Sequence, residues 1–185
     1  MSSKQPPFQA DAPATRIEAT VPTKDYCRQA GMLGDELMDV IADVIRSDKP
    51  VLGAAVSRFE KNLAAFHDVP FAVGVGSGTD ALIMAMRALE LGPGDEVITC
   101  SHTFSGVISA ISLVGATPVL VAPDPRFGTL SVEGAEAAIT PKTRAVLAVH
   151  FYGHPVDLDG LVSLCRRRGV LLIEDCAQAH GATWR

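Results

Sequence analysis

The sequence predicts an α/β fold in which a largely parallel sheet is covered by helices. Short apolar segments alternate along the chain with longer segments of helical periodicity, which is the order expected of βαβ units. The short segments are continuously apolar, as strands are when both faces of a parallel sheet are buried. The chain has 185 residues, of which 48% are hydrophobic, so it can bury a core of its own.

Two helices are expected before the first strand. Residues 35–47 repeat apolar side chains every three or four positions, and Pro50 follows the end of this pattern. A second apolar stripe covers residues 54–67. Residues 1–25 carry four prolines among polar residues, so they are expected to form a disordered tail or an arm that lies on a partner subunit. Residues 26–185 are expected to form part of one larger domain.

The alternating region begins at Phe71. A short buried strand is expected at residues 71–75, followed by a glycine-rich turn and a helix over 80–91. Valine, isoleucine and leucine then predict strands at 96–100, 117–122, 145–149 and 170–173. Helical periodicity predicts helices at 104–114, 131–139 and 158–168, the second of them capped by Ser131.

Composition excludes several classes of protein. A net charge of −5 and an aromatic content of 5% argue against nucleic acid as a partner, because such surfaces need basic stripes or stacking platforms. No apolar run reaches the ~18–20 residues of a membrane span, and no apolar stretch follows Lys4 as in a secretory signal. The four cysteines show no zinc or disulfide spacing, so reduced thiols and a cytoplasmic location are expected.

Polar and glycine-rich segments fall where the predicted strands end. Ligands of open α/β sheets bind outside the carboxyl ends of the strands. The sequence therefore predicts a ligand site built from residues 76–79, 101–104, 123–124, 150–154 and 174–178.

The segment Gly76–Thr79 joins the first predicted strand to a helix. Its glycines let the backbone approach a ligand closely, and Gly78 and Thr79 stand where a helix N-terminus attracts an anion such as phosphate. The segment matches neither the dinucleotide-binding nor the P-loop pattern. The alternative interpretation is a tight turn in which Thr79 only caps the helix.

Two further segments favour a planar, nitrogen-containing ring as the ligand. Phe104 is placed to lie against such a ring, although it could instead pack in the core. Asp175 follows what is expected to be the most buried strand, where an unpaired carboxylate is costly. Pyridoxal phosphate (PLP) supplies a partner for it, since an acid on the pyridine nitrogen keeps the ring an electron sink. Gln178 would reach the ring's phenolic oxygen, whereas the alternative is that Asp175 only caps the residues that follow.

A metal site is the other chemistry that the sequence offers. His150 and His154 could be combined with His102, His180 and Asp175, but Gly153 and Pro155 argue against a helix that would place the two nearest histidines on one face. Cys176 could be a nucleophile, yet no base is evident beside it. No metal ligand set is therefore predicted.

Taken in order, these segments resemble the DegT/DnrJ/EryC1/StrS family of PLP-dependent sugar aminotransferases. The resemblance covers about residues 40–185 and rests on an ordered set of motifs. The motifs are VGSGTDAL at 75–82, GPGDEVI at 92–98, TF at 103–104, GATPV at 115–119, HFYG at 150–153 and IEDCAQAHGA at 173–182.

The resemblance implies the large domain of a fold type I PLP-transferase, the aspartate aminotransferase-like fold. It implies that Gly78 and Thr79 hold the cofactor phosphate, that Phe104 stacks on the ring, that Asp175 pairs with the pyridine nitrogen and that Gln178 contacts the phenolic oxygen. The implied substrates are a nucleotide-linked keto-sugar and glutamate or glutamine as amino donor. The implied assembly is a homodimer with sites at the subunit interface.

The sequence departs from the family at the Schiff-base lysine. In the family this residue follows the segment that matches residues 179–182, and no lysine of this chain fits the position; the lysines are Lys4, Lys24, Lys49, Lys61 and Lys142. The chain is therefore expected to be a partial large domain without the C-terminal domain, to bind the cofactor weakly and to be inactive alone. The alternatives are a PLP-dependent sugar dehydratase of the same family, or a non-catalytic fragment that pairs with a full-length paralogue.

Overall fold

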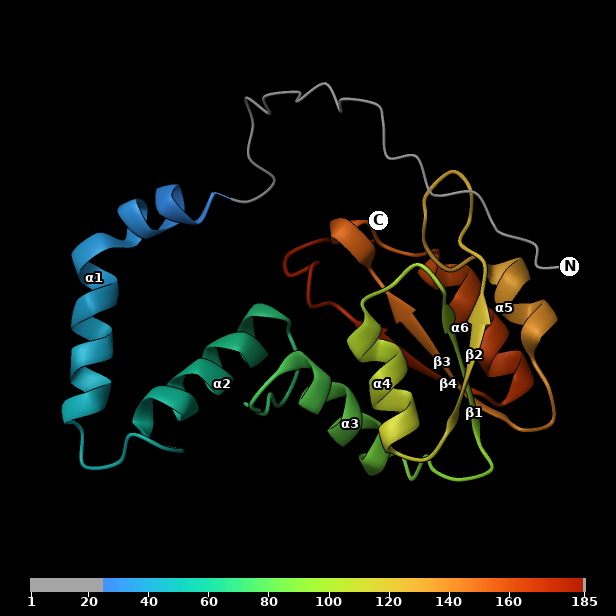
Figure 1. The fold of residues 1–185 in the computed structure, drawn as a ribbon, viewed down its shortest axis with the longest axis horizontal. Helices are drawn as coiled ribbons and strands as arrows, with labels where there is room; N and C mark the ends of the chain where they lie inside the picture. Colours follow the sequence, from blue (N-terminus) through green and yellow to red (C-terminus); the bar gives the residue numbers. More distant parts are fainter. Residues whose placement is uncertain (1–24, 185) are drawn as a thin grey trace, which may run out of the picture. The chain divides into compact units, whose positions relative to one another are not determined.

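A computed structural model of the chain describes residues 25–184 (Figure 1). Its contacts separate two compact units, Met1–Ala55 and Val56–Arg185. The predicted disordered tail lies outside the described residues except for Asp25, so it stays a prediction.

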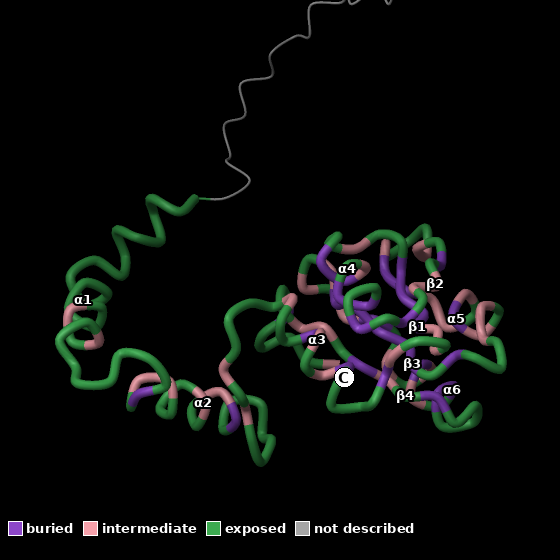
Figure 2. Tube along the Cα trace, turned by 60° about the horizontal axis from the view of Figure 1, so that its bottom comes forward, coloured by how far each residue is buried: buried purple, intermediate pink, exposed green. Residues whose placement is uncertain are grey.

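The first unit contains helix α1 (Tyr26–Arg46). The helix begins nine residues before the predicted start at Asp35. Asp25 caps it by accepting a hydrogen bond from the backbone N–H of Arg28 (2.9 Å), and Gly34 interrupts it with a φ of 38°. This glycine breaks the apolar repeat, which explains why the pattern pointed only to the second half. The described residues of α1 are mostly exposed (Figure 2).

The second unit is built on a parallel sheet of four strands. These are β1 (Glu96–Cys100), β2 (Thr117–Val121), β3 (Thr143–Val149) and β4 (Leu171–Asp175), in the order β2-β1-β3-β4. All three pairings are parallel, so the strands end together at one edge, here called the carboxyl edge (Figure 1). The four strands predicted from residue 96 onward are confirmed.

Helices cover both faces of this sheet. On one face, α3 (Gly78–Ala88) and α4 (Ser105–Leu113) pack on the side chains of Val97, Leu147 and Val149. On the other face, α5 (Val132–Ala138) and α6 (Leu158–Arg168) pack on the alternate residues of the strands. The buried positions therefore concentrate in β1, β3 and the helix sides turned toward them (Figure 2). The predicted α/β architecture is confirmed.

Helix ends follow the expected chemistry. Ser131 caps α5 as predicted, its Oγ accepting from the N–H of Gly134 (3.0 Å). Helix α6 ends at Gly169, which adopts a φ of 66° that glycine tolerates better than other residues. Helix α2 (Ala54–Phe66) begins at the boundary between the two units. Among the described residues, no helix combines the length and the apolar character that crossing a membrane would require.

The predicted strand at residues 71–75 is wrong. This segment is not part of the four-stranded sheet, and the Phe71 side chain is 83% exposed. A strand needs a neighbour that shares its backbone hydrogen bonds, and no strand of the described residues lies beside this one. Its Gly74 N–H instead donates to the Glu60 carboxylate on α2 (2.8 Å).

The expected burial of the last strand is also wrong. Of the β4 residues, only Ile173 is buried. The strand forms an edge of the described sheet, whereas β1 and β3 lie inside it. An apolar composition shows that a segment suits a covered sheet, but it does not show the position of the segment within the sheet.

Burial makes a testable prediction about the cysteines. It raises the pKa of the Cys100 and Cys165 thiols, which lie in the cluster beneath α5 and α6, whereas Cys27 is exposed. The thiolate is the reactive form, so iodoacetamide at pH 8 should modify Cys27 at least about tenfold faster than the two buried thiols. Peptide mass spectrometry over time measures the rates. The three thiols should react at equal rates only in denaturant. Equal rates in the native protein would contradict the burial of Cys100 and Cys165.

Candidate functional site

The carboxyl edge contains the point where the chain changes direction across the sheet. From β1 the chain passes through α4 to β2 on one side, and it then returns past β1 to form β3 and β4 on the other. Ligand sites of α/β sheets lie at such points, here between the ends of β1 and β3. The two loops that follow these strands meet there, because the rings of His102 and Phe151 are in edge contact with centroids 4.6 Å apart.

The N-terminus of α3 lies beside the start of α4, since a Cβ on Gly106 would lie 2.8 Å from the Thr79 hydroxyl, and the first backbone N–H groups of α3 are directed to this end of the sheet. Ser77 caps the helix by accepting from the N–H of Asp80 (3.1 Å) and donates to the Asp80 carboxylate (2.9 Å). Thr79 is therefore not the cap, and that alternative is wrong. Gly78 begins the helix, and a Cβ placed on it would meet no atom within 4 Å, so there is room for a ligand. The Asp80 carboxylate adds negative charge at this helix end, which opposes an anion.

Phe104 lies at the start of α4 with its side chain 62% exposed, so the alternative that it packs in the core is wrong. Its ring lies over Gly106. A Cβ on Gly106 would come within 2.3 Å of the Phe104 ring and 2.8 Å of the Thr79 hydroxyl. Glycine at this position therefore lets the ring and the hydroxyl approach each other. The adjacent Thr103 has a buried Oγ1 with no partner among the described residues, a rare state that a ligand could relieve.

Asp175 ends β4 and is half-buried. Its Oδ1 accepts from the N–H of Ala177 (3.0 Å), which is the local capping that the alternative interpretation described. This bond uses one of the two carboxylate oxygens. Capping and a contact with a ligand are therefore compatible at this residue.

Gln178 is tied to the loop that follows β3. Its side-chain oxygen Oε1 accepts from the backbone N–H of Tyr152 (2.7 Å). The amide NH₂ group is therefore the end of this side chain that is left to contact a ligand. Tyr152 lies in the predicted segment 150–154, but sequence patterns did not indicate this contact, because the Tyr152 backbone makes it.

His150, Glu174 and Cys176 place three possible metal-ligand atoms within 4.8 Å of one another. His150 Nδ1 accepts from the N–H of Val156 (3.2 Å), so its Nε2 carries the proton toward Glu174 Oε2 (3.1 Å). Burial, and then the charges of Glu174 and Asp175, raise the pKa of the Cys176 thiol. In this arrangement neither ring nitrogen of His150 offers a free lone pair to a metal. The raised pKa disfavours the Cys176 thiolate, both as a metal ligand and as a nucleophile.

The other histidines lie in separate contacts. His102 Nδ1 is 2.8 Å from the carbonyl oxygen of Gly128, His154 stacks on Phe127, and His180 pairs with His67. The structure therefore does not assemble the histidine combination that the sequence offered as a metal site.

The segment at Asp124 forms a turn of its own. The Arg126 side chain and backbone, together with the Phe127 N–H, hold the pKa of the Asp124 carboxyl below its usual range. These contacts explain Asp124 as a loop residue. The turn reaches the neighbouring loop through the contact of Gly128 with His102.

The sequence predicts no catalytic residue within this chain, and this stays a prediction. The described lysines lie away from the carboxyl edge or in segments before it. Lys142 directly precedes β3 and so lies at the opposite edge of the sheet, and Lys49 and Lys61 lie in the segments before α3. The origin of a catalytic amine stays a prediction.

A family model and curated proteins both match this chain, and the matches point to one family. Residues 32–185 match the model of the DegT/DnrJ/EryC1/StrS aminotransferase family. The chain is 44% identical over 162 residues to a UDP-N-acetyl-3-dehydro-α-D-glucosamine 3-aminotransferase of Acidithiobacillus ferrooxidans, a match covering 88% of this chain and 44% of that protein. It is 50% identical over 145 residues to a dTDP-3-amino-3,4,6-trideoxy-α-D-glucose transaminase of Streptomyces venezuelae, covering 78% and 38%.

Solved structures of related proteins superpose on this chain. DesV of S. venezuelae superposes with a TM-score of 0.84 at 47% identity, covering 87% of this chain and 43% of that one. NtdA of Bacillus subtilis, solved with the bound cofactor PMP, superposes with a TM-score of 0.75 at 32% identity, covering 81% and 35%. The chain thus spans less than half the length of these proteins.

Proposed function

Because the chain belongs to the DegT/DnrJ/EryC1/StrS aminotransferase family, we propose that the intact protein is a PLP-dependent aminotransferase of a nucleotide-linked keto-sugar. The described sheet and helices have the α/β architecture of the fold type I aminotransferases. The activity, the substrates and the assembly are proposed for the intact protein, since the chain spans less than half of its relatives.

One observation carries the proposal. The start of α3 with Gly78 and Thr79 lies beside the start of α4, where the exposed ring of Phe104 follows β1. The segment from Asp175 to Gln178 follows from the end of β4, so all of these lie at the carboxyl edge. PLP offers a phosphate, a flat ring, a basic ring nitrogen and a phenolic oxygen. Each has a counterpart of suitable chemistry here, so the residues present fit this cofactor.

The residues then have separate tasks. The first N–H groups of α3 and the Thr79 hydroxyl bind the phosphate. Phe104 lies against one side of the ring and keeps water from it. Asp175 holds a proton on the ring nitrogen, and Gln178 donates a hydrogen bond to the phenolic oxygen. When bound, the cofactor supplies the electron sink on which amino transfer depends.

The names of the relatives support the substrate class. One acts on a UDP-linked sugar and the other on a dTDP-linked sugar, and both names describe an amino group at carbon 3. We propose a nucleotide-linked keto-sugar as acceptor, with glutamate or glutamine as amino donor and a homodimer as the active form. The relatives use different nucleotides, so the proposal extends to the class and not to one nucleotide.

The experiment starts from PLP binding. The intact protein is titrated with PLP and followed by absorbance, and then incubated with ¹⁵N-amino-labelled glutamate or glutamine and a panel of nucleotide-linked keto-sugars. Mass spectrometry should find a sugar product that carries the labelled amine. A product that has lost water without gaining an amine would assign the dehydratase chemistry, and folded protein that binds no PLP would contradict the proposal.

Replacing Phe104 with leucine should weaken PLP binding. Leucine keeps an apolar side chain but removes the flat ring, and such ring contacts contribute roughly 0.5–1.5 kcal/mol, so Kd should rise about two- to tenfold. Phe127→Leu is the control, since that ring is also exposed but lies in the turn after β2. Absorbance titration gives both constants, and equal shifts for the two variants would argue against stacking at Phe104.

A further inference from the structure

Tyr152 holds an unusual backbone conformation beside the candidate site. Its φ of 55° and ψ of 23° lie in the left-handed region, which side chains other than glycine and asparagine rarely adopt. Its ring is 79% exposed, so core packing does not require this conformation. Strained backbone of this kind concentrates at functional sites, where surrounding contacts impose it.

The conformation directs the Tyr152 N–H onto the side chain of Gln178. The N–H donates to Oε1 at 2.7 Å. A backbone N–H can only donate, so it selects the oxygen end of the amide and fixes which way the amide faces. Without this contact, the amide could turn its oxygen toward a ligand that accepts hydrogen bonds, and the oxygen cannot donate to such a ligand.

His150 holds the loop in place. Its backbone N–H donates to the Asp175 carbonyl oxygen (3.1 Å), and its side chain donates to the Glu174 carboxylate (3.1 Å). The side chain is 4% exposed. The two segments also approach closely at Gly153, where a Cβ would lie 3.2 Å from the Gln178 carbonyl oxygen. The loop after β3 is thus fastened to residues 174–178 on both sides of Tyr152.

We propose that Tyr152, His150 and Glu174 are positioning residues that set the direction of the Gln178 amide. Through the Tyr152 N–H they occupy its oxygen and leave its NH₂ group to donate to the phenolic oxygen of the cofactor. This inference rests on the proposed function, because the phenolic oxygen belongs to PLP. Tyr152 acts through its backbone, whereas His150 and Glu174 act through their side chains.

The test compares Tyr152→Asn with Tyr152→Val in the intact protein. Both variants lose the ring, but asparagine tolerates the left-handed region and valine does not. In cofactor-free protein labelled with ¹⁵N-glutamine, NMR reports whether the Gln178 NH₂ group is immobilised, and Gln178→Met assigns its signals. The amide should be immobile in the wild type and in Tyr152→Asn, and mobile in Tyr152→Val. The PLP Kd should rise about tenfold for valine and recover with asparagine.

A second pair keeps the test decisive if Tyr152→Val fails to fold. Glu174→Gln retains an oxygen that accepts from His150, and Glu174→Leu does not, so only leucine should release the Gln178 amide and weaken PLP binding. Equal NMR signals and equal Kd values within each pair would overturn the inference, as would a mobile amide with an unchanged Kd. If the Gln178 amide responds as expected but the protein binds no PLP, the result would support the orienting contact and overturn the proposed function instead.

Discussion

Replacing Asp175 with asparagine should abolish most amino transfer in the intact protein. Asparagine keeps the shape of the side chain and an oxygen that can accept from the Ala177 N–H, as Asp175 Oδ1 does at 3.0 Å. It carries no negative charge, so it does not hold a proton on the ring nitrogen. Removing one member of a hydrogen-bonded charge pair costs about 2–5 kcal/mol, which corresponds to a turnover loss of roughly 30-fold to several thousandfold.

Asp157→Asn is the matched control for this prediction. Asp157 also caps a local turn, its Oδ1 accepting from the N–H of Gly160 (3.1 Å) at the start of α6, and asparagine caps helices about as well as aspartate. If Asp175 were only a cap, the two variants would behave alike. Steady-state rates and PLP titrations on both variants separate the interpretations, and a wild-type rate in Asp175→Asn would refute the proposed contact with the ring nitrogen.

The sheet shows how far sequence patterns can predict a fold. Strands β1 and β3 were predicted because they are apolar on both faces, and they lie inside the sheet. Residues 71–75 have a similar composition but form no strand in the described structure. A strand is completed by hydrogen bonds to a neighbour that is distant in sequence. Local composition does not report whether such a neighbour is present.

At the site, too, sequence patterns predict some features and not others. The sequence predicts that the glycine-rich start of α3, the ring of Phe104 and the carboxylate of Asp175 face a cofactor, because phosphate and a protonated ring nitrogen require particular groups at strand ends. Their roles toward that cofactor stay predictions. The contacts made by Gly106 and Tyr152 could not be predicted. Tyr152 and Gln178 are 26 positions apart, and only the fold brings their loops together. The spacing of His150 and His154 is that of some metal motifs, although no metal site was predicted from it, and His150 proves to be a buried partner of Glu174.

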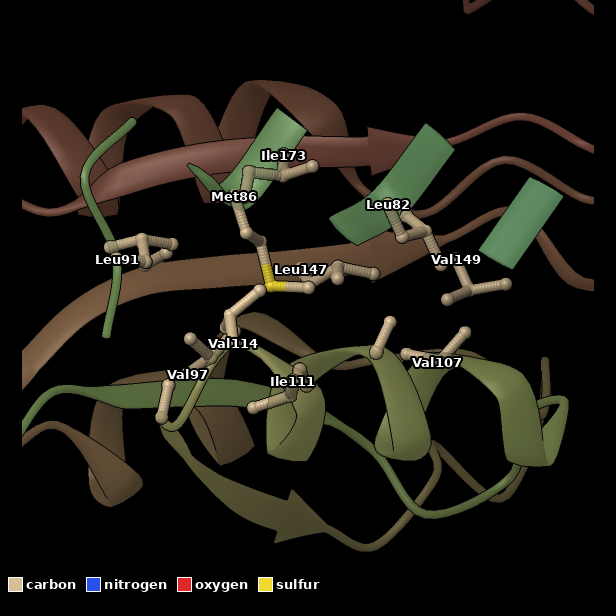
Figure 3. Packing of buried hydrophobic residues seen from close by; sticks show 13 residues of the cluster. Leu82, Met86, Leu91, Val97, Val107, Ile111, Val114, Leu147, Val149 and Ile173 are labelled. Atoms are coloured by element: carbon tan, nitrogen blue, oxygen red, sulfur yellow. The ribbon is translucent and has the colours of Figure 1, made fainter. Parts of the chain in front are cut away.

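Replacing Met86 with alanine should strongly destabilise the second unit. Met86 is 0% exposed, and its side chain lies among those of Leu147, Val114 and Ile111 in the core between α3, α4 and the sheet (Figure 3). Truncation of a buried methionine leaves a cavity and costs about 2–5 kcal/mol. For a chain of this size that corresponds to a fall in Tm of roughly 5–15 °C, which differential scanning calorimetry can measure.

The same substitution should also weaken PLP binding, because Met86 anchors the helix whose first residues are proposed to hold the phosphate. Met84→Ala is the control, since Met84 lies on α3 but is 58% exposed, and a surface change of this kind shifts stability by about 0.5 kcal/mol or less. PLP titration well below the Tm of each variant separates loosening of α3 from global unfolding. A higher Kd in Met86→Ala alone would mean that core packing sets the position of the phosphate site, whereas equal Kd values would mean that the start of α3 is held by its own cap at Ser77.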